Sequence, residues 1–273
     1  MLPHTTLQDV ASQAARAGGK ALLDRQFQQR DITSKGHLDI VTDADFAADA
    51  AIQQTIHHHF PEHTILSEES DAAAHIDTWR PPEDTYTWII DPLDGTNNYA
   101  RGNPSWSVSV AVARGGQILA GAVYDATRDH LFFASQGGGA WLNEKRLQVR
   151  ATELEWAALA ADWPTHPPYR RMQWDMLDQL MPEVRTLRCW GTTALALAHI
   201  AAGYLDVYLN RGFKIWDVAA GILLVQEAAG QVTRLDGSAW ALHQRDLLAT
   251  NGYLHSTIQE RIAPVVADHE LPG

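Results

Sequence analysis

Residues 88–96 read Trp-Ile-Ile-Asp-Pro-Leu-Asp-Gly-Thr, so an apolar strand runs directly into two carboxylates, Asp91 and Asp94. Pro92 fixes its own φ and disfavours a helix at Asp91, and we therefore expect a stiff turn to hold both carboxylates. Carboxylate oxygens suit magnesium, which takes few protein ligands and keeps water and substrate phosphate around it. Gly95 lets a phosphate approach the backbone, and Thr96 can cap a following helix whose amides favour anions. The segment predicts adjoining cation and anion sites, although an Asp-rich turn that only caps a helix has the same pattern.

Two helices are expected ahead of this segment. Apolar residues at helical spacing predict a helix from about Thr6 to Arg30, which Gly18-Gly19 weakens locally. A second helix is expected from about Asp43 to Phe60, because Pro61 stops it. The residues assigned to its apolar side are Phe46, Ala50 and Ile56.

The rest of the chain predicts a layered α/β fold in two parts. Short apolar runs predict strands at Thr64–Leu66 and Tyr86–Ile90, and runs separated by turn signals predict an antiparallel meander from Ser107 to Val149. We place a boundary near Val149–Thr152, which gives an α+β part, 1–150, and an α/β part, 151–273. Strands and helices should alternate in the second part, over Ala157–Ala161, Tyr169–Leu180, Arg185–Cys189, Thr192–Ala202, Tyr204–Leu209, Trp216–Ala229 and Val232–Leu235.

Composition excludes several classes of function. Of 273 residues, 45% are hydrophobic and 20% charged, as in ordinary globular proteins. No apolar run approaches the ~20 residues that span a bilayer, so we expect a cytoplasmic protein that does not enter membranes. The single cysteine, Cys189, excludes an intrachain disulfide and is expected to be a small buried hydrophobe. A formal charge of −12 argues against nucleic acid as the main partner, because phosphate contacts need clustered Lys and Arg.

Several segments, in order along nearly the whole chain, resemble those of one known family. Trp88 to Asn97 resembles the first signature of the inositol monophosphatase family, Asp-Pro-(Ile/Leu)-Asp-Gly-Thr-x-Asn, without a gap. Trp216 to Gly221, followed by Glu227 to Gly230, resembles the second signature. Ser67-Glu68-Glu69-Ser70, with Ser in place of the usual Gly, and Lys35 with Asp39 to Asp45 resemble two further family segments. The resemblance implies an alternating α-β-α-β-α sandwich of the inositol monophosphatase and fructose-1,6-bisphosphatase type.

The resemblance also implies a site and a chemistry. Glu68, Asp91, Asp94 and Asp217, with the Leu93 carbonyl and the Thr96 hydroxyl, would hold two magnesium ions, and a third, weaker ion is expected near Glu68. Thr96 and Asp45 would orient the attacking water and accept its proton, with Lys35 as a positive charge near the phosphate. The residues implied in substrate binding are Asp94, Gly95, Thr96, Thr193, Asn210 and Asp217. Lithium sensitivity and a homodimer are further family expectations.

Each of these residues taken alone has an ordinary structural reading. Glu68 alone is more often a solvated acid at a strand end, and Lys35 alone is usually a surface lysine. Asp217 alone is more often a carboxylate in the first turn of a helix, where it meets the helix macrodipole. The order of the linked segments favours the functional reading.

The substrate is the least determined part of the sequence reading. Inositol-selective family members have a glutamate seven residues before the second-signature aspartate, where this chain has Asn210. Arg211 and Lys214 could favour a second phosphate or a carboxylate on the substrate. Inositol 1-phosphate is the first hypothesis, and 3′(2′),5′-bisphosphate nucleotides, fructose 1,6-bisphosphate and histidinol phosphate are the alternatives. A non-catalytic binding protein or a magnesium- or phosphate-sensing module with the same fold is a further alternative.

Overall fold

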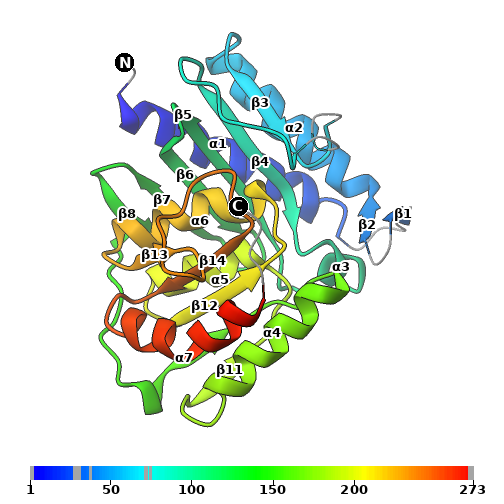
Figure 1. Ribbon diagram of the computed structural model, residues 1–273. Helices are drawn as coiled ribbons and strands as arrows, with labels where there is room; N and C mark the ends of the chain where they lie inside the picture. The colour runs from blue at the N-terminus through cyan, green and yellow to red at the C-terminus, as the bar shows by residue number, and fades with distance from the viewer. Residues whose placement is uncertain (1–2, 27–31, 37–38, 71–72, 74–75, 270–273) are drawn as a thin grey trace.

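The computed structural model describes residues 3–26, 32–36, 39–70, 73 and 76–269. Two large sheets alternate with pairs of helices, as Figure 1 shows. The helices are α1 (His4–Leu23), α2 (Asp43–His59), α3 (Thr96–Ala100), α4 (Pro167–Leu180), α5 (Thr193–Ala201), α6 (Ile215–Glu227) and α7 (His255–Asp268).

A seven-stranded sheet forms the first β layer, in the order β3-β4-β5-β6-β7-β8-β9. β3 and β4 are parallel, and the other pairs are antiparallel, which confirms the predicted meander. Its strands are β3 (Thr64–Ser67), β4 (Thr87–Asp94), β5 (Ser107–Arg114), β6 (Gln117–Asp125), β7 (His130–Ser135), β8 (Gly139–Leu142) and β9 (Lys145–Arg146).

A five-stranded sheet forms the second β layer, in the order β11-β10-β12-β14-β13. A separate two-stranded ribbon precedes α2. The strands of the sheet are β10 (Ala158–Ala160), β11 (Thr186–Arg188), β12 (Val207–Arg211), β13 (Gln231–Thr233) and β14 (Asp246–Thr250), and those of the ribbon are β1 (Ile32–Gly36) and β2 (Asp39–Thr42).

The helices complete an α-β-α-β-α sandwich, as expected. α1 and α2 cover one face of the seven-stranded sheet, α5 and α6 lie between the two sheets, and α4 and α7 cover the outer face of the five-stranded sheet (Figure 1). The largest hydrophobic cluster contains Ile89 and Val123 from the first half of the chain together with Leu197 and Leu223 from the second. The two halves therefore share a core. No described helix is long and apolar enough to cross a membrane.

Two local expectations need correction. The first helix ends at Leu23 instead of near Arg30. Gly18 and Gly19 lie inside this helix at points of close packing: a Cβ on Gly18 would meet the Ile52 side chain at 2.8 Å, and one on Gly19 would meet the Tyr124 ring at 2.5 Å. In α2 the expected apolar side was right at Ile56, which is buried, and wrong at Ala50, which is exposed, and at Phe46, which is 53% exposed. The side that packs inward contains Ala44, Ala48, Ile52 and Ile56.

Candidate active site

The two carboxylates of residues 88–96 lie at an irregular strand end instead of in a separate turn. β4 continues to Asp94, and its register against β5 shifts between Asp91, opposite Ser109, and Asp94, opposite Ser107. Asp91 accepts a hydrogen bond from the Leu93 amide at 3.0 Å. The shift of register inserts residues without partners, as a β-bulge does, and so re-aims the side chains at the end of the strand.

Gly95 is required by the turn that follows. Its φ is +96°, and a Cβ there would lie 3.0 Å from the Ser105 carbonyl oxygen, so both conformation and space exclude a larger residue. Gly95 occupies the cap position of α3, and Thr96 is the first helical residue instead of the expected cap. The Thr96 hydroxyl lies 3.0 Å from the Leu93 carbonyl oxygen and 3.2 Å from Asp45 Oδ1.

Two helix N-termini position further acids. Asp45 and Asp217 are each the third residue of their helix, α2 and α6, and each carboxylate reaches back to the backbone amide before the helix. Asp45 Oδ2 accepts from the Thr42 amide at 2.9 Å and from the Thr42 hydroxyl at 2.6 Å. Asp217 Oδ2 accepts from the Lys214 amide at 2.7 Å. These capping bonds fix the rotamers of both acids.

The N-terminus of α5 orients Asp94. Asp94 Oδ2 accepts hydrogen bonds from the Thr192 hydroxyl and from the Ala194 amide, the latter at 2.9 Å. The Ser107 hydroxyl lies 3.4 Å away on the β5 side. Residues almost one hundred positions later in the chain therefore orient the carboxylate.

The acids line one pocket within electrostatic range of one another. Burial raises the pKa of Asp91 well above its usual value, and the charges of Glu68, Asp94 and Asp217 raise it further. Burial, followed by the charges of Glu68 and Asp94, also raises the pKa of Asp217 well above normal. The pKa of Asp94 rises to about 7, chiefly through burial. Without a cation among them, these carboxylates repel each other.

The donor chemistry suits magnesium, although the acids do not form a closed cage. In the described part of the chain, no three or more His, Cys, Asp or Glu side chains are arranged as a ready metal cluster. Asp91, Asp94 and Asp217 each accept a hydrogen bond from a backbone amide with one carboxylate oxygen. Magnesium takes few protein ligands and completes its shell with water and phosphate, so an open set of carboxylates fits it.

A pocket of about 340 Å³ collects most of the expected residues. Asp45 contacts it through Thr96, and Asn210 is not among its described lining residues. The Lys35 side chain lies outside the described part of the chain, so its expected role has no structural counterpart here. The expected residues that line the pocket are Glu68, Asp91, Leu93, Asp94, Gly95, Thr96, Thr193 and Asp217.

Asn210, Arg211 and Lys214, which the sequence suggested for substrate selectivity, make their contacts outside the pocket lining. Asn210 is 5% exposed, donates to the Tyr208 hydroxyl at 3.0 Å and accepts from the Arg211 amide at 2.7 Å. Arg211 is buried, with its guanidinium 4.5 Å from the centre of the Tyr169 ring. Lys214 Nζ lies 3.3 Å from Asp77. Neither cation lines the pocket.

Sequence reasoning missed four pocket residues outside the signature segments: Asp162, Trp163, Thr165 and Cys189. Asp162 lines the pocket and contacts Thr193 and Tyr208, but a single acid after a short apolar run gives no motif. Cys189 also lines it and is exposed, so the expectation of a buried cysteine was wrong.

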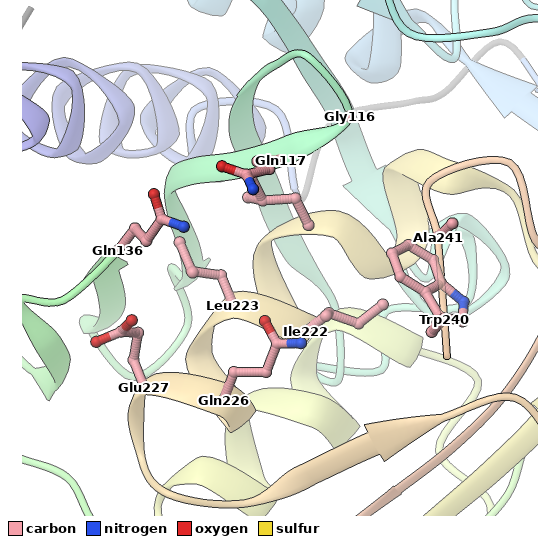
Figure 2. Close-up of a pocket in the computed structure, with 10 residues that line it drawn as sticks. Gly116, Gln117, Gln136, Ile222, Leu223, Gln226, Glu227, Trp240 and Ala241 are labelled. Atoms are coloured by element: carbon pink, nitrogen blue, oxygen red, sulfur yellow. The ribbon is translucent and has the colours of Figure 1, made fainter. Parts of the chain in front are cut away.

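A second pocket, of about 270 Å³, lies at the opposite end of α6. Figure 2 shows Gln117, Gln136 and Gln226 around it, with the Trp240 indole at one side. Glu227 is the one titratable residue of its described lining, and its carboxylate accepts from the Gly137 and Gly139 amides at 2.8 Å each. The Glu of the second signature thus ties α6 to the β7–β8 turn.

The comparisons with known proteins agree with this fold. Residues 4–271 match the model of the inositol monophosphatase family. An inositol-1-monophosphatase of Rhizobium meliloti is 33% identical over 270 residues, which are 96% of this chain and 97% of the relative. The Nus factor SuhB of Pasteurella multocida is 36% identical over 265 residues, covering 95% and 97%. The crystal structure of suhB from Bartonella henselae has a TM-score of 0.86 at 33% identity, covering 94% and 98%.

The family match and the inositol-1-monophosphatase relative define a phosphatase of the hydrolase class. The chain belongs to the inositol monophosphatase family.

Proposed function

We propose that this chain hydrolyses inositol 1-phosphate in a magnesium-dependent reaction. The observation that carries the proposal is the mutual approach of Glu68, Asp91, Asp94 and Asp217 beside the Gly95–Thr96 turn. Glu68, Asp91, Asp94 and Asp217, with the Leu93 carbonyl, would hold two to three ions. Magnesium bound there would neutralise phosphoryl charge and make water more acidic.

The protein's own groups would position the ester and handle the proton. The amides of Gly95 and Thr96 would bind phosphoryl oxygens, a contact that the absence of a Cβ at Gly95 permits. Thr96 would orient the attacking water with its hydroxyl oxygen and would donate its own proton to Asp45 Oδ1, which lies 3.2 Å away. Asp45 keeps its other oxygen on Thr42, so it would act as a fixed proton acceptor. Lys35, Thr193 and Asn210 remain proposed contributors, and the homodimer and the cytoplasmic location remain predictions.

Other esters and a non-catalytic role are the competing proposals. A bisphosphate substrate lost support, because Arg211 and Lys214 make contacts away from the pocket. Relatives named Nus factor SuhB keep open a binding role that would not need turnover. The intact Asp45–Thr96 contact supports catalysis, since water activation alone would require it.

Phosphate release from a panel of esters with magnesium tests the proposal. We expect inositol 1-phosphate to give a higher kcat/KM than fructose 1,6-bisphosphate, adenosine 3′,5′-bisphosphate or histidinol phosphate. Lithium on the order of tens of millimolar should inhibit, because a mostly water-ligated cation position is weak enough for a small monovalent ion to enter. Absence of release from all four esters would favour the binding role, and turnover that lithium leaves unchanged would contradict the weak cation position.

A further inference from the structure

Asp162 is an acid of the pocket that belongs neither to the magnesium set nor to the Thr96–Asp45 pair. It follows β10, is half-buried and lines the pocket. Its Oδ1 accepts from the Gly191 amide at 2.9 Å, and its Oδ2 accepts from the Tyr208 hydroxyl at 2.8 Å and the Thr193 hydroxyl at 3.1 Å. Three donors, from the loop before α5, from α5 and from β12, hold this carboxylate in one orientation.

The donors behind Asp162 are themselves ordered. The Asn210 amide group donates to the Tyr208 oxygen at 3.0 Å, the Tyr208 hydroxyl donates to Asp162, and the Tyr208 and Thr193 hydroxyls lie 2.9 Å apart. Burial raises the pKa of Asp162, and the hydrogen bonds from Tyr208, Gly191 and Thr193 oppose that effect by stabilising the charged form. The network therefore presents an acceptor to the pocket, and Asn210 supports it from behind.

Asp162 also lies next to the phosphate end of the site. Consecutive residues at the start of α5 hold the two acids: Thr192 donates to Asp94, and Thr193 donates to Asp162. Once the acids around Asp91 and the Gly95–Thr96 turn are assigned to cation and phosphate, the remaining wall must face the alcohol portion of the ester. That wall consists of Asn97, Asn98, Asp162, Trp163, Thr165, Cys189, Gly191 and Thr193, and Asp162 is its one acid.

We propose that Asp162 selects the alcohol portion of the substrate by accepting a hydrogen bond from it. The inference rests on the proposed phosphatase activity and narrows its substrate class to monophosphate esters whose alcohol carries a further hydrogen-bond donor, a hydroxyl or an ammonium group. A second phosphate in the same place would meet a fixed negative charge with no cation of the described lining to offset it. The pocket therefore selects against bisphosphates.

Asp162→Asn tests this selection, because it removes the charge and keeps the shape. We expect kcat/KM for inositol 1-phosphate to fall about tenfold, mainly through KM, since hydrogen bonds to charged groups are stronger than those to amides. p-Nitrophenyl phosphate has no donor on its alcohol and should change less than about twofold, while fructose 1,6-bisphosphate should gain. Histidinol phosphate separates the two kinds of donor. Its kcat/KM should fall more than that of inositol 1-phosphate, because an ammonium group interacts more strongly with a carboxylate than a hydroxyl does.

Two further variants and one binding measurement complete the experiment. Asp84→Asn removes an equal charge from an acid that is 98% exposed and outside the pocket, and it should leave all ratios unchanged. Tyr208→Phe removes one donor to Asp162 and should shift selectivity in the same direction by less. Inositol 1-phosphate should protect Cys189, the single cysteine, from alkylation in the parent protein at lower concentrations than in Asp162→Asn.

The outcomes separate this inference from the function beneath it. In one outcome, kcat/KM changes by the same factor for all esters in both Asp162→Asn and Tyr208→Phe, and inositol 1-phosphate protects Cys189 equally in the parent and in Asp162→Asn. That result would overturn the role of Asp162 and leave the phosphatase proposal standing. A parent protein that releases phosphate from none of the esters would overturn the phosphatase proposal and this inference with it.

Discussion

Exchange of Asp91 for asparagine is expected to lower kcat/KM for inositol 1-phosphate by at least about a thousandfold. Asp91 faces Glu68, Asp94 and Asp217, so it is the acid best placed to serve more than one cation. Loss of one charged ligand at a metal that stabilises transferring phosphate costs several kcal/mol, and about 4 kcal/mol corresponds to a thousandfold. Phosphate release under saturating magnesium measures the loss.

The same exchange should stabilise the metal-free protein. The pKa of Asp91 is raised in the folded state, so the stability linked to its protonated form is present below the unfolded pKa and is lost as pH rises through the folded pKa. Asparagine stays neutral at every pH. The melting temperature of metal-free Asp91→Asn should therefore exceed that of the parent by about 2 °C or more at pH 8, and by less at pH 5.

The control for this pair of measurements is Asp84→Asn, which removes an exposed acid. It should change neither turnover nor the pH dependence of melting. If Asp91→Asn loses activity and metal-free stability together, the acid has a structural role, and its charge does not destabilise the metal-free protein.

Exchange of Asp45 for asparagine is expected to lower kcat by about a hundredfold to ten-thousandfold with little change in KM. The asparagine oxygen can keep the cap on the Thr42 amide, which leaves an amide donor to face the Thr96 hydroxyl. That hydroxyl can then direct its proton only to the Leu93 carbonyl, and no acceptor remains for the proton of the attacking water. Steady-state kinetics at saturating magnesium separate kcat from KM.

Asp43→Asn provides the matched control for Asp45. Asp43 is an exposed acid in the first turn of the same helix, so its exchange removes a similar interaction with the helix macrodipole without touching Thr96. Activity should stay within about twofold of the parent. An equal loss in Asp43→Asn and Asp45→Asn would point to the stability of α2 instead of proton transfer.

Sequence patterns within short segments predicted the antiparallel meander, β12 and α6. The meander follows from alternating short apolar runs and glycine turns, and β12 and α6 begin within a few residues of their expected starts. β14 and α7 were not anticipated, because one is a five-residue run and the other contains Pro264, which normally ends a helix. The inward side of α2 was misassigned because alanines, which carry little apolar signal, fill the close contact with α1.

The site likewise has residues that a local motif predicts and residues that only the fold brings together. The acids and glycine of residues 91–96 are adjacent in sequence and could be read from one motif. Asp162 depends on Gly191, Thr193 and Tyr208, whose positions are 29, 31 and 46 residues away, and no local pattern encodes that meeting. Asn210 was expected to contribute to substrate binding, and its contact with Tyr208 could not be read from the sequence, because β12 directs the side chain into the buried network.

Phosphate release from inositol 1-phosphate before and after metal removal tests the central claim most directly. The protein should turn over with added magnesium, stop when a chelator is present in excess, and recover when magnesium again exceeds the chelator, because the four facing carboxylates bind phosphate only when cations offset their charge. Undiminished release of phosphate in excess chelator would contradict the account.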